Sequence, residues 1–369
     1  MEIGIPKEIK VNEHRVGITP NGVAMLVQSG HHVVVEHDAG TAAGYTDADY
    51  QNAGAELGDN VAAWRAEMVI KVKEPLKSEY EFLRSDMVLY TYLHLAANPE
   101  LTAALTAHGT TAIGYETMTA PDGSLPTLTP MSQVAGRMAV LLGGQYLQTQ
   151  YGGKGMLLTG VPGVRQANVV VIGGGVVGQN AAKVAVGLGA KVTLLDINPR
   201  VLNQVDSEFN GRVQTLFSTS ANIAIAVKTA DLVIGAVLIA GSRAPKLVTE
   251  DMIKSMAPGS VVVDIPIDQG GIFATSTHAT TFDDPTYVVH GVIHYAVANL
   301  PGAVPQTATD VLTSVTIPFA KQIADKGVHD AVQASPELLS GVNFYKGALV
   351  NKAVGESLTL PVESLEDLL

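Results

Sequence analysis

The feature that most constrains the fold is a glycine-rich turn near the middle of the chain. An apolar, β-forming run at 169–172 leads directly into the segment Gly173-Gly174-Gly175-Val176-Val177-Gly178. A helical pattern follows at 179–188, and a second strand pattern at 191–196 ends on Asp196. Strand, tight turn, helix, second strand and terminal acid, in this order, are the parts of a βαβ unit that binds a dinucleotide.

Each part of this unit has a physical task. Gly173 makes the tight turn, Gly175 removes a side chain where the backbone approaches a pyrophosphate, and Gly178 lets helix and strand pack closely. The pyrophosphate would rest on the N-terminus of the helix. Asp196 can bind both ribose hydroxyls and repels a 2′-phosphate, so the sequence predicts NAD rather than NADP. Glycines in such turns often have only a structural role, but the presence of all five parts in the right order favours dinucleotide binding.

Short β-forming runs alternate with helical patterns in two parts of the chain, as is typical of parallel sheets. The runs in the first part are 1–6, 32–36, 67–73, 87–94 and 110–116. Those in the second part are 169–172, 191–196, 212–218, 231–237, 260–266 and 286–292. We therefore predict an α/β protein with two doubly wound domains, one of them a six-stranded NAD-binding Rossmann fold, and an inter-domain cleft.

Capping signals mark three helices of the first part. Thr19-Pro20 begins a helix that ends at Gly30, Asn98-Pro99 begins one that ends at Gly109, and Thr46 with Asp49 forms a capping box. These residues satisfy backbone groups that a helix end leaves without partners.

Two longer helical patterns, 131–151 and 304–326, could connect the domains. Pro318 predicts a kink or an end within the second. We recognise no strand signal beyond it, so the tail is expected to pack on the first domain. This gives a discontinuous substrate domain, 1–127 plus 305–369, around an NAD-binding domain at 128–304.

Composition limits the partners and the chemistry. The 369 residues include 23 Lys and Arg against 35 Asp and Glu, a formal net charge of −12, which argues against a nucleic-acid partner or a basic membrane arm. The sequence has no cysteine, which excludes thiol catalysis and a Cys-based zinc site. No metal site is predicted, and small molecules are the expected partners.

The longest apolar stretches do not resemble membrane spans. Those at 169–190 and 222–241 contain charged residues and are interrupted by glycines. The first ten residues alternate apolar and charged side chains, unlike a secretory signal. A cytoplasmic protein is therefore expected.

Polar residues after the predicted strands suggest a catalytic site, because ligands of open α/β sheets bind beyond the carboxyl ends of strands. Lys73 and His94 end two strand runs, Arg15 lies in the loop after the first strand, and Asp268 follows the run at 260–266. They could converge on the cleft, where two cations suit a small anionic substrate. Any one of them alone could instead be a solvated residue.

Other polar residues have simpler interpretations. His290 and His294 have the spacing of a metal pair on a helix, but they lie in a β-rich run, where that spacing does not chelate. We interpret Lys183, Asp231 and Asp264 as solvated or turn residues.

Several short motifs, spread over some 300 residues, together resemble those of bacterial alanine dehydrogenases. They are Gly4-Ile5-Pro6-Lys7-Glu8, Glu13-His14-Arg15-Val16, Lys71-Val72-Lys73-Glu74-Pro75, Leu93-His94-Leu95, Met131-Ser132-Gln133-Val134-Ala135-Gly136-Arg137, Ile267-Asp268-Gln269-Gly270-Gly271 and Val297-Ala298-Asn299. The resemblance covers nearly the whole chain and is more specific than the glycine turn alone.

The resemblance implies reversible oxidative deamination of L-alanine by NAD to pyruvate, ammonium and NADH. It assigns substrate binding to Arg15 and Lys73, acid/base catalysis to His94, and the handling of water or ammonia to Asp268. It also implies that Ser132, Asp196 and Asn299 line the cofactor site, and that the protein forms a homohexamer.

This sequence departs from the family pattern at a few positions. Pro266 stands where a small residue is expected, and Leu300 where Met is frequent. Ile272 and Ala296 occupy positions that often hold Cys, and Gln306 replaces a basic residue. None of these changes removes a proposed catalytic group.

Three other functions remain open. The chain could be the soluble NAD-binding module of a transhydrogenase, although such a module does not need Arg15, Lys73 and His94. It could be an opine-type dehydrogenase acting on a larger substrate such as lysine or ornithine, or a catalytically inactive NAD sensor.

Overall fold

The structure, a computed structural model, describes residues 1–237 and 244–369. The chain divides into two compact units: unit 1 comprises Met1–Met131 and Val304–Leu369, and unit 2 comprises Ser132–Ala303. These boundaries lie close to the predicted ones after 127 and 304. Each unit is built on a doubly wound sheet, so the predicted fold class is correct.

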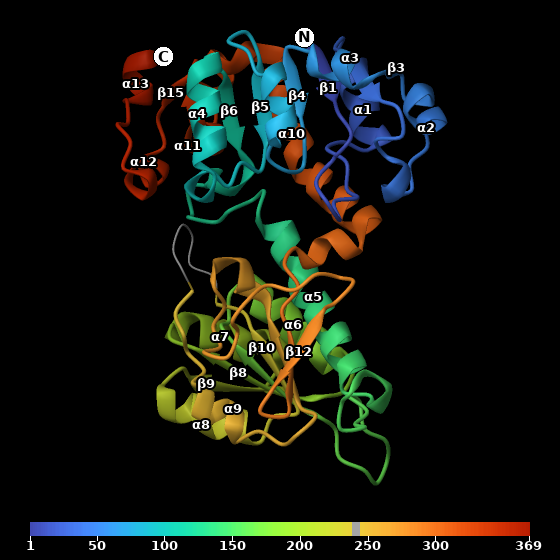
Figure 1. The fold of residues 1–369 in the computed structure, drawn as a ribbon, viewed down its shortest axis with the longest axis vertical. Coiled ribbons are helices and arrows are strands. Elements are labelled where there is room, and N and C mark those ends of the chain that lie inside the picture. The colour runs from blue at the N-terminus through green and yellow to red at the C-terminus, as the bar shows by residue number, and fades with distance from the viewer. Residues whose placement is uncertain (238–243) are drawn as a thin grey trace. The chain divides into compact units, whose positions relative to one another are not determined.

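Unit 1 contains an eight-stranded sheet in the order β15-β14-β6-β5-β4-β1-β2-β3 (Figure 1). Its strands are β1 (Glu2–Ile5), β2 (His32–Glu36), β3 (Glu56–Gly58), β4 (Met68–Ile70), β5 (Val88–Thr91), β6 (Thr111–Gly114), β14 (Val342–Tyr345) and β15 (Ala348–Leu349). β1 to β6 run parallel, and β14 pairs antiparallel with β6 and β15.

The helices of unit 1 cover both faces of this sheet. They are α1 (Pro20–Gln28), α2 (Asp47–Asn52), α3 (Asn60–Trp64), α4 (Pro99–His108), α10 (Pro305–Ala334), α11 (Pro336–Gly341), α12 (Lys352–Leu358) and α13 (Leu365–Leu368). Met68 and Ile70 of β4 belong to an apolar cluster with α10, whereas Val69 belongs to the cluster with α4. This alternation places the core on both sides of the sheet.

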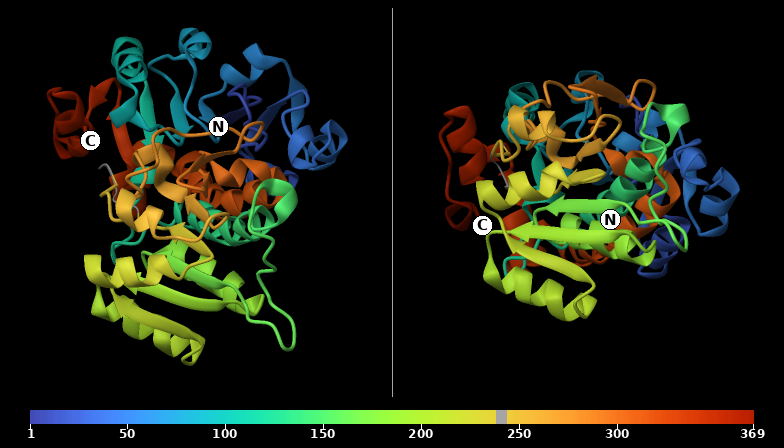
Figure 2. Two further views of the ribbon diagram at one scale, coloured as in Figure 1. Left: turned by 60° about the horizontal axis from the view of Figure 1, so that its bottom comes forward. Right: turned by 90° about the horizontal axis from the view of Figure 1, so that it is seen from below.

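Unit 2 contains a seven-stranded sheet in the order β12-β13-β11-β10-β7-β8-β9. Figure 2 shows the ribbon from two further directions. Its strands are β7 (Asn168–Ile172), β8 (Lys191–Asp196), β9 (Val213–Phe217), β10 (Leu232–Gly235), β11 (Val261–Asp264), β12 (Thr286–Val289) and β13 (Val292–Tyr295). The helices are α5 (Thr129–Tyr146), which begins in unit 1, α6 (Val176–Gly187), α7 (Pro199–Phe209), α8 (Ser220–Lys228) and α9 (Glu250–Lys254).

The capping predictions are confirmed. Thr19 accepts a hydrogen bond from the backbone N–H of Gly22 at the start of α1, and Thr46 and Asp49 form a capping box in α2. Asn98 caps α4, which ends at Gly109 with φ +69°. Local sequence was sufficient here because each cap involves residues only a few positions apart.

Several predictions about elements are wrong. The run at 286–292 is not one strand but the hairpin β12–β13, whose turn residues His290 and Gly291 have φ +52° and +77°. The tail beyond 326 does contain strands, β14 and β15, although it packs on unit 1 as expected. α10 continues through Pro318 and departs from helical geometry at Gly327, with φ +77°. β3 was not predicted, and α5 ends at Tyr146 rather than at 151.

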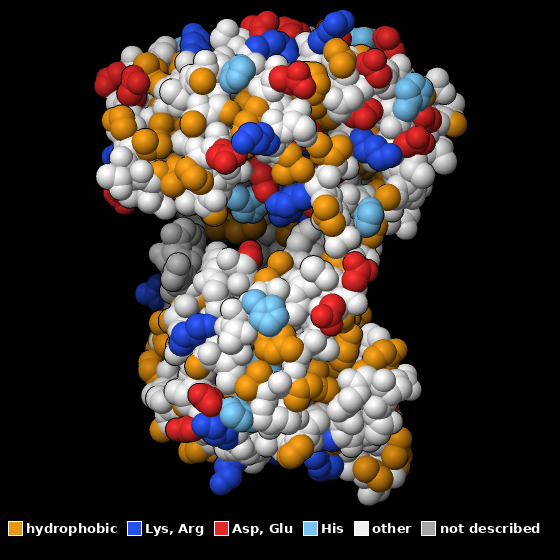
Figure 3. Space-filling model, viewed as in Figure 1, with side chains coloured by type: hydrophobic (Ala, Val, Ile, Leu, Met, Phe, Trp, Pro, Cys, Tyr) orange, Lys and Arg blue, Asp and Glu red, His pale blue; other side chains and the backbone are white. Residues whose placement is uncertain are grey.

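In the described part of the chain, no helix has the length and apolar character needed to cross a bilayer. Residues 238–241 of the apolar stretch 222–241 lie outside that part. On the face shown in Figure 3, acidic and basic side chains are interspersed rather than separated into a broad basic area.

Candidate active site

Arg15 lies in the loop between β1 and α1, where a neighbouring carboxylate holds its guanidinium. Nε donates to Glu13 Oε1 at 2.6 Å and Nη2 donates to Glu13 Oε2 at 2.5 Å, while Nη1 lies 3.1 Å from Met131 Sδ. Both charged side chains are almost completely buried. Burial would raise the pKa of Glu13, but hydrogen bonds and the charge of Arg15 lower it. The pair therefore stays ionised and fixes the guanidinium plane.

Lys73 follows β4 and is half-buried. Its backbone is held, because its N–H donates to Glu8 Oε1 at 3.2 Å and its carbonyl accepts from Thr91 Oγ1 at 3.0 Å. Its Nζ has no hydrogen bond or ion pair with any residue in 1–237 or 244–369. Burial, and then the charge of Arg15, lower the pKa of Lys73. A partly desolvated ammonium near a guanidinium favours an incoming anion.

A buried ion network lies behind Lys73 and was not predicted. Lys71 Nζ lies 2.9 Å from Glu79 Oε1 and 3.3 Å from Glu8 Oε2, and all three side chains are buried. Glu8 Oε1 also accepts from the backbone N–H of Val72 at 2.6 Å. Glu8 thus links the Lys71 charge to the chain segment that carries Lys73.

His94 follows β5 in an unusual backbone conformation. Its φ is +49°, in the left-handed region that disfavours residues other than glycine. Its N–H donates to Glu116 Oε1 at 2.7 Å, and the N–H of Leu93 contacts both Glu116 oxygens at 3.1 Å. Glu116 therefore stabilises the turn that exposes the imidazole.

Glu74 contacts the imidazole of His94 directly. Its Oε2 lies 3.2 Å from His94 Nδ1, and its Oε1 pairs with Lys10 Nζ. Burial opposes ionisation, but the hydrogen bonds and charges of His94 and Lys10 lower the pKa of Glu74 to about 2. Sequence reasoning gave Glu74 and Glu116 no role. The strand-end rule that selected Lys73 and His94 also selects these carboxylates, which follow β4 and β6.

In unit 2, the glycine turn has the geometry that a pyrophosphate requires. Gly173 has φ +103°, and a Cβ on Gly178 would lie 1.8 Å from the carbonyl oxygen of Gly173. A Cβ on Gly175 would instead meet nothing within 4 Å. Gly175 is the N-cap of α6 and provides no side-chain cap, so the helix N-terminus has donors for an anion. The residues present fit a dinucleotide.

Asp196 ends β8 against this turn. Its Oδ2 accepts from the N–H of Gly174 at 2.6 Å, and its Oδ1 accepts from the N–H of Asn198 at 2.7 Å. The carboxylate is therefore oriented by the backbone while remaining partly exposed. This is the geometry expected of an acid that recognises ribose hydroxyls.

Asp268 lies in the 3₁₀ helix Ile265–Gln269, directly after β11, and is exposed. Pairing of β11 stops at Asp264, so Pro266 removes no hydrogen bond from the sheet, as predicted, although the turn begins one residue earlier, at Ile265. Lys246 Nζ donates to the carbonyl oxygens of Gly270 at 2.5 Å and Phe273 at 2.8 Å. This lysine, which sequence reasoning missed, ties down the segment after Asp268.

The other two predicted cofactor residues also lie in unit 2. Ser132 is in the first turns of α5, and Asn299 has φ +63° just before the 3₁₀ helix Leu300–Ala303. Both are partly exposed. Leu300, Ile272 and Ala296, three of the departures from the family pattern, are buried apolar residues.

Two aspartates interpreted as solvated are in fact buried. Asp231 accepts hydrogen bonds from Arg165 and from the backbone N–H of Asn168, and it also pairs with Lys154. Asp264 Oδ1 accepts from the N–H of Ile272 at 3.1 Å. Their partners are distant in sequence or on another loop, so a local pattern could not reveal the burial.

No group of His, Asp and Glu residues suited to a metal ion occurs in the described residues. His290 is bonded to Glu250, and buried His294 lies 2.7 Å from Thr275 Oγ1, so the two histidines have separate partners.

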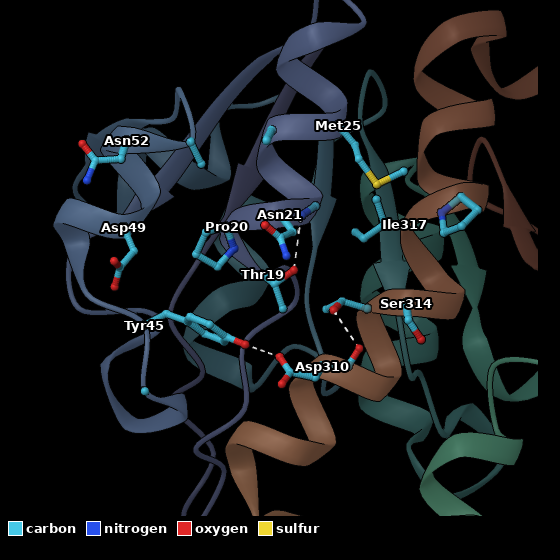
Figure 4. Close-up of a pocket in the computed structure, with 16 residues that line it drawn as sticks. Thr19, Pro20, Asn21, Met25, Tyr45, Asp49, Asn52, Asp310, Ser314 and Ile317 are labelled. Atoms are coloured by element: carbon cyan, nitrogen blue, oxygen red, sulfur yellow. Dashed lines mark hydrogen bonds between the residues drawn. The ribbon is translucent and has the colours of Figure 1, made fainter.

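A cavity of about 850 Å³ lies between α1, α2 and α10 of unit 1 (Figure 4). Tyr45 donates its hydroxyl hydrogen to Asp310 there, and Asp49 is engaged in the α2 capping box. None of the predicted site residues lines this cavity. It is therefore separate from the candidate site.

Comparison with known proteins identifies the family. Residues 4–135 match the N-terminal domain, and residues 139–352 the C-terminal domain, of the alanine dehydrogenase/PNT family. The chain belongs to this family. It is 56% identical to an alanine dehydrogenase of Staphylococcus haemolyticus over 370 aligned positions, covering 100% of this chain and 99% of that protein.

Solved structures of an alanine dehydrogenase and of a transhydrogenase can both be compared with this chain. An L-alanine dehydrogenase structure has 50% identity and a TM-score of 0.94, covering 97% of this chain and 99% of its own. The structure of a transhydrogenase from Sinorhizobium meliloti has 28% identity and a TM-score of 0.82, and the match covers 96% of this chain and 100% of that one. Both share the fold of this alanine dehydrogenase/PNT member, but the sequence is much more similar to the first.

Proposed function

We propose that this protein catalyses the reversible, NAD-dependent oxidative deamination of L-alanine to pyruvate and ammonium. The observation that carries the proposal is the Arg15 guanidinium, fixed by Glu13, near the Lys73 ammonium, which has no ion-pair or hydrogen-bond partner in the described residues. Two such cations suit a small carboxylate. Full-length similarity to proteins named alanine dehydrogenase supports the same substrate.

We propose that Arg15 and Lys73 bind the carboxylate and carbonyl groups of the substrate. In the oxidative direction the amine must lose its extra proton before its lone pair can form the C=N bond. Bound NAD would supply the acceptor for the hydride that leaves the α-carbon. Water then adds to the imine carbon, and loss of ammonia gives the carbonyl group of pyruvate.

We assign the proton transfers of this sequence to His94 and Asp268. Nδ1 of His94 faces Glu74, so the atom that exchanges protons with the imine or carbinolamine oxygen would be Nε2. Asp268 offers an acceptor for water or ammonia and can stabilise a cationic imine. Both assignments agree with the family resemblance.

The cofactor would be held by the turn at Gly173, Gly175 and Gly178 together with Asp196. The open space at Gly175 and the donors of the α6 N-terminus suit a pyrophosphate. The negative charge of Asp196 disfavours a 2′-phosphate, so NAD is preferred over NADP. We also assign Ser132 and Asn299 to this site.

The deciding experiment follows NADH absorbance with the purified protein and no partner protein present. Oxidation of NADH with pyruvate and ammonium supports the proposal. Oxidation only with 2-oxoglutarate and lysine would identify an opine-type enzyme. NAD binding without turnover of either mixture would instead favour a transhydrogenase module or a sensor.

We also propose a homo-oligomer, with a hexamer suggested by the family resemblance. The segment after α5 exposes Leu157, Val161 and Val164 at 58%, 54% and 64%, and apolar side chains grouped in one exposed segment support a contact with another subunit. Light scattering coupled to size-exclusion chromatography measures the oligomeric state. The cytoplasmic location stays a prediction, to be tested by cell fractionation.

A further inference from the structure

The two carboxylates beside His94, those of Glu116 and Glu74, contact different parts of the residue. Glu116 binds the backbone N–H groups of Leu93 and His94, and so fixes the chain. Glu74 contacts the ring itself, at Nδ1, with a carboxylate that is only 10% exposed. The imidazole is 44% exposed, so one edge is held by protein while the rest remains accessible.

The chemistry of this contact determines where the imidazole carries its proton. An ionised carboxylate can only accept hydrogen bonds, so the Nδ1 atom facing it must carry a hydrogen. A neutral imidazole then has its lone pair on Nε2. The pKa of Glu74 is lowered to about 2, so this carboxylate is ionised at neutral pH.

Lys10 occupies the other oxygen of the same carboxylate. It comes from the β1–α1 loop, which also carries Arg15, and it pairs with Glu74 Oε1 while Oε2 faces His94. With one oxygen engaged by Lys10, the carboxylate has a defined orientation toward the ring.

We propose that Glu74 is a positioning residue that holds His94 in the tautomer with hydrogen on Nδ1, leaving Nε2 as the atom that accepts and donates the catalytic proton. This inference rests on the proposed function only for the statement that His94 is the acid/base group. The tautomer itself is a property of the protein without substrate.

The first test therefore needs no activity. The protein contains ten histidines, so solid-state NMR of protein labelled with ¹⁵N-histidine is compared with that of His94→Ala, and the signals that disappear belong to His94. At a pH where the ring is neutral, we expect a protonated Nδ1 and an unprotonated Nε2. A wild-type ring with hydrogen on Nε2 would overturn the proposal.

The second test uses Glu74→Gln. The Lys10 ammonium attracts the amide oxygen, which leaves the amide NH2 facing Nδ1, where it donates a hydrogen bond and favours the opposite tautomer. We expect His94 to change tautomer and kcat to fall by roughly 10²–10⁴-fold, with a much smaller change in KM for pyruvate. Glu74→Asp keeps a carboxylate and should retain roughly tenfold more activity than Glu74→Gln. Glu81→Gln, the same change at an exposed residue of unit 1, is the matched control.

The outcomes separate the two proposals. An unchanged tautomer and kcat in Glu74→Gln overturn the positioning role even if the wild type is an active alanine dehydrogenase. A wild type with the expected tautomer but no alanine turnover overturns the proposed function and leaves the positioning of His94 standing. If Glu74→Gln fails to fold, the wild-type tautomer and Glu74→Asp still decide.

Discussion

At the scale of single residues, two lysines separated by one position have opposite roles. Lys71 is enclosed with two carboxylates, whereas the ammonium of Lys73 has no carboxylate partner in the described residues. Removing one member of a buried ion network leaves the others uncompensated, and this typically costs about 3–5 kcal/mol. Lys73 forms no ion pair in the described residues, so its removal disrupts no such network.

We therefore predict that Lys71→Met lowers the free energy of unfolding by about 3–5 kcal/mol. Lys73→Met should leave stability nearly unchanged but raise KM for pyruvate roughly tenfold or more, the effect of losing a charge-assisted hydrogen bond. Urea denaturation and steady-state kinetics on both variants check this. Normal pyruvate kinetics in Lys73→Met would remove that residue from the substrate site.

At the scale of elements, the turn between β7 and α6 depends on an acid from the neighbouring strand. Because Asp196 accepts from both Gly174 and Asn198, it orders the turn and also carries the charge that selects the cofactor. We predict that Asp196→Ala weakens NAD binding by about 1–3 kcal/mol and narrows the preference for NAD over NADP.

Asp196→Asn removes the charge but keeps one of the two acceptor oxygens, so it retains a hydrogen bond from only one of the two backbone N–H groups, that of Gly174 or that of Asn198. It should narrow the cofactor preference with a smaller loss of NAD affinity. Calorimetric titration with NAD and NADP measures both quantities. Equal use of NAD and NADP by the wild type would show that the acid does not select the cofactor.

The 3₁₀ helix Ile265–Gln269, which contains Asp268, has a proline as its second residue, and we make a second prediction for this element. Pro266 is buried and lies two residues after Asp264, the last paired residue of β11, so its missing N–H breaks no hydrogen bond of the sheet. We expect Pro266→Ala to keep alanine dehydrogenase activity and to change stability by about 1 kcal/mol or less. An inactive wild type that gains activity on this substitution would mean that the proline distorts the site.

At the scale of the whole molecule, Glu74 ties the stability of the protein to pH. Its pKa falls from 4.5 to about 2 on folding, so its contribution is complete above about pH 4.5 and is lost as the pH falls toward 2. Such a shift corresponds to about 3 kcal/mol. Glu74→Gln should thus be less stable than wild type at neutral pH, and the difference should vanish near pH 2. Denaturation curves at several pH values measure this; a difference that does not depend on pH would contradict it.

The sequence by itself determined the features that depend on neighbours along the chain. The caps at Thr19, Thr46 and Asn98, the glycine turn before α6 and the end of pairing before Pro266 all involve residues a few positions apart. The alternating pattern of strands and helices fixed the fold class for the same reason, since each element carries its own periodicity.

The tertiary structure decided what depends on distant partners. β14 joins the sheet beside β6, more than 200 residues away, and Lys71 finds Glu8 across 63 positions. Glu74 and Glu116 reach His94 only because β4, β5 and β6 are neighbours and end at the same edge. Strand adjacency is set by packing of the whole sheet, so no local pattern could show that Glu116 binds the backbone of His94 while Glu74 contacts its imidazole.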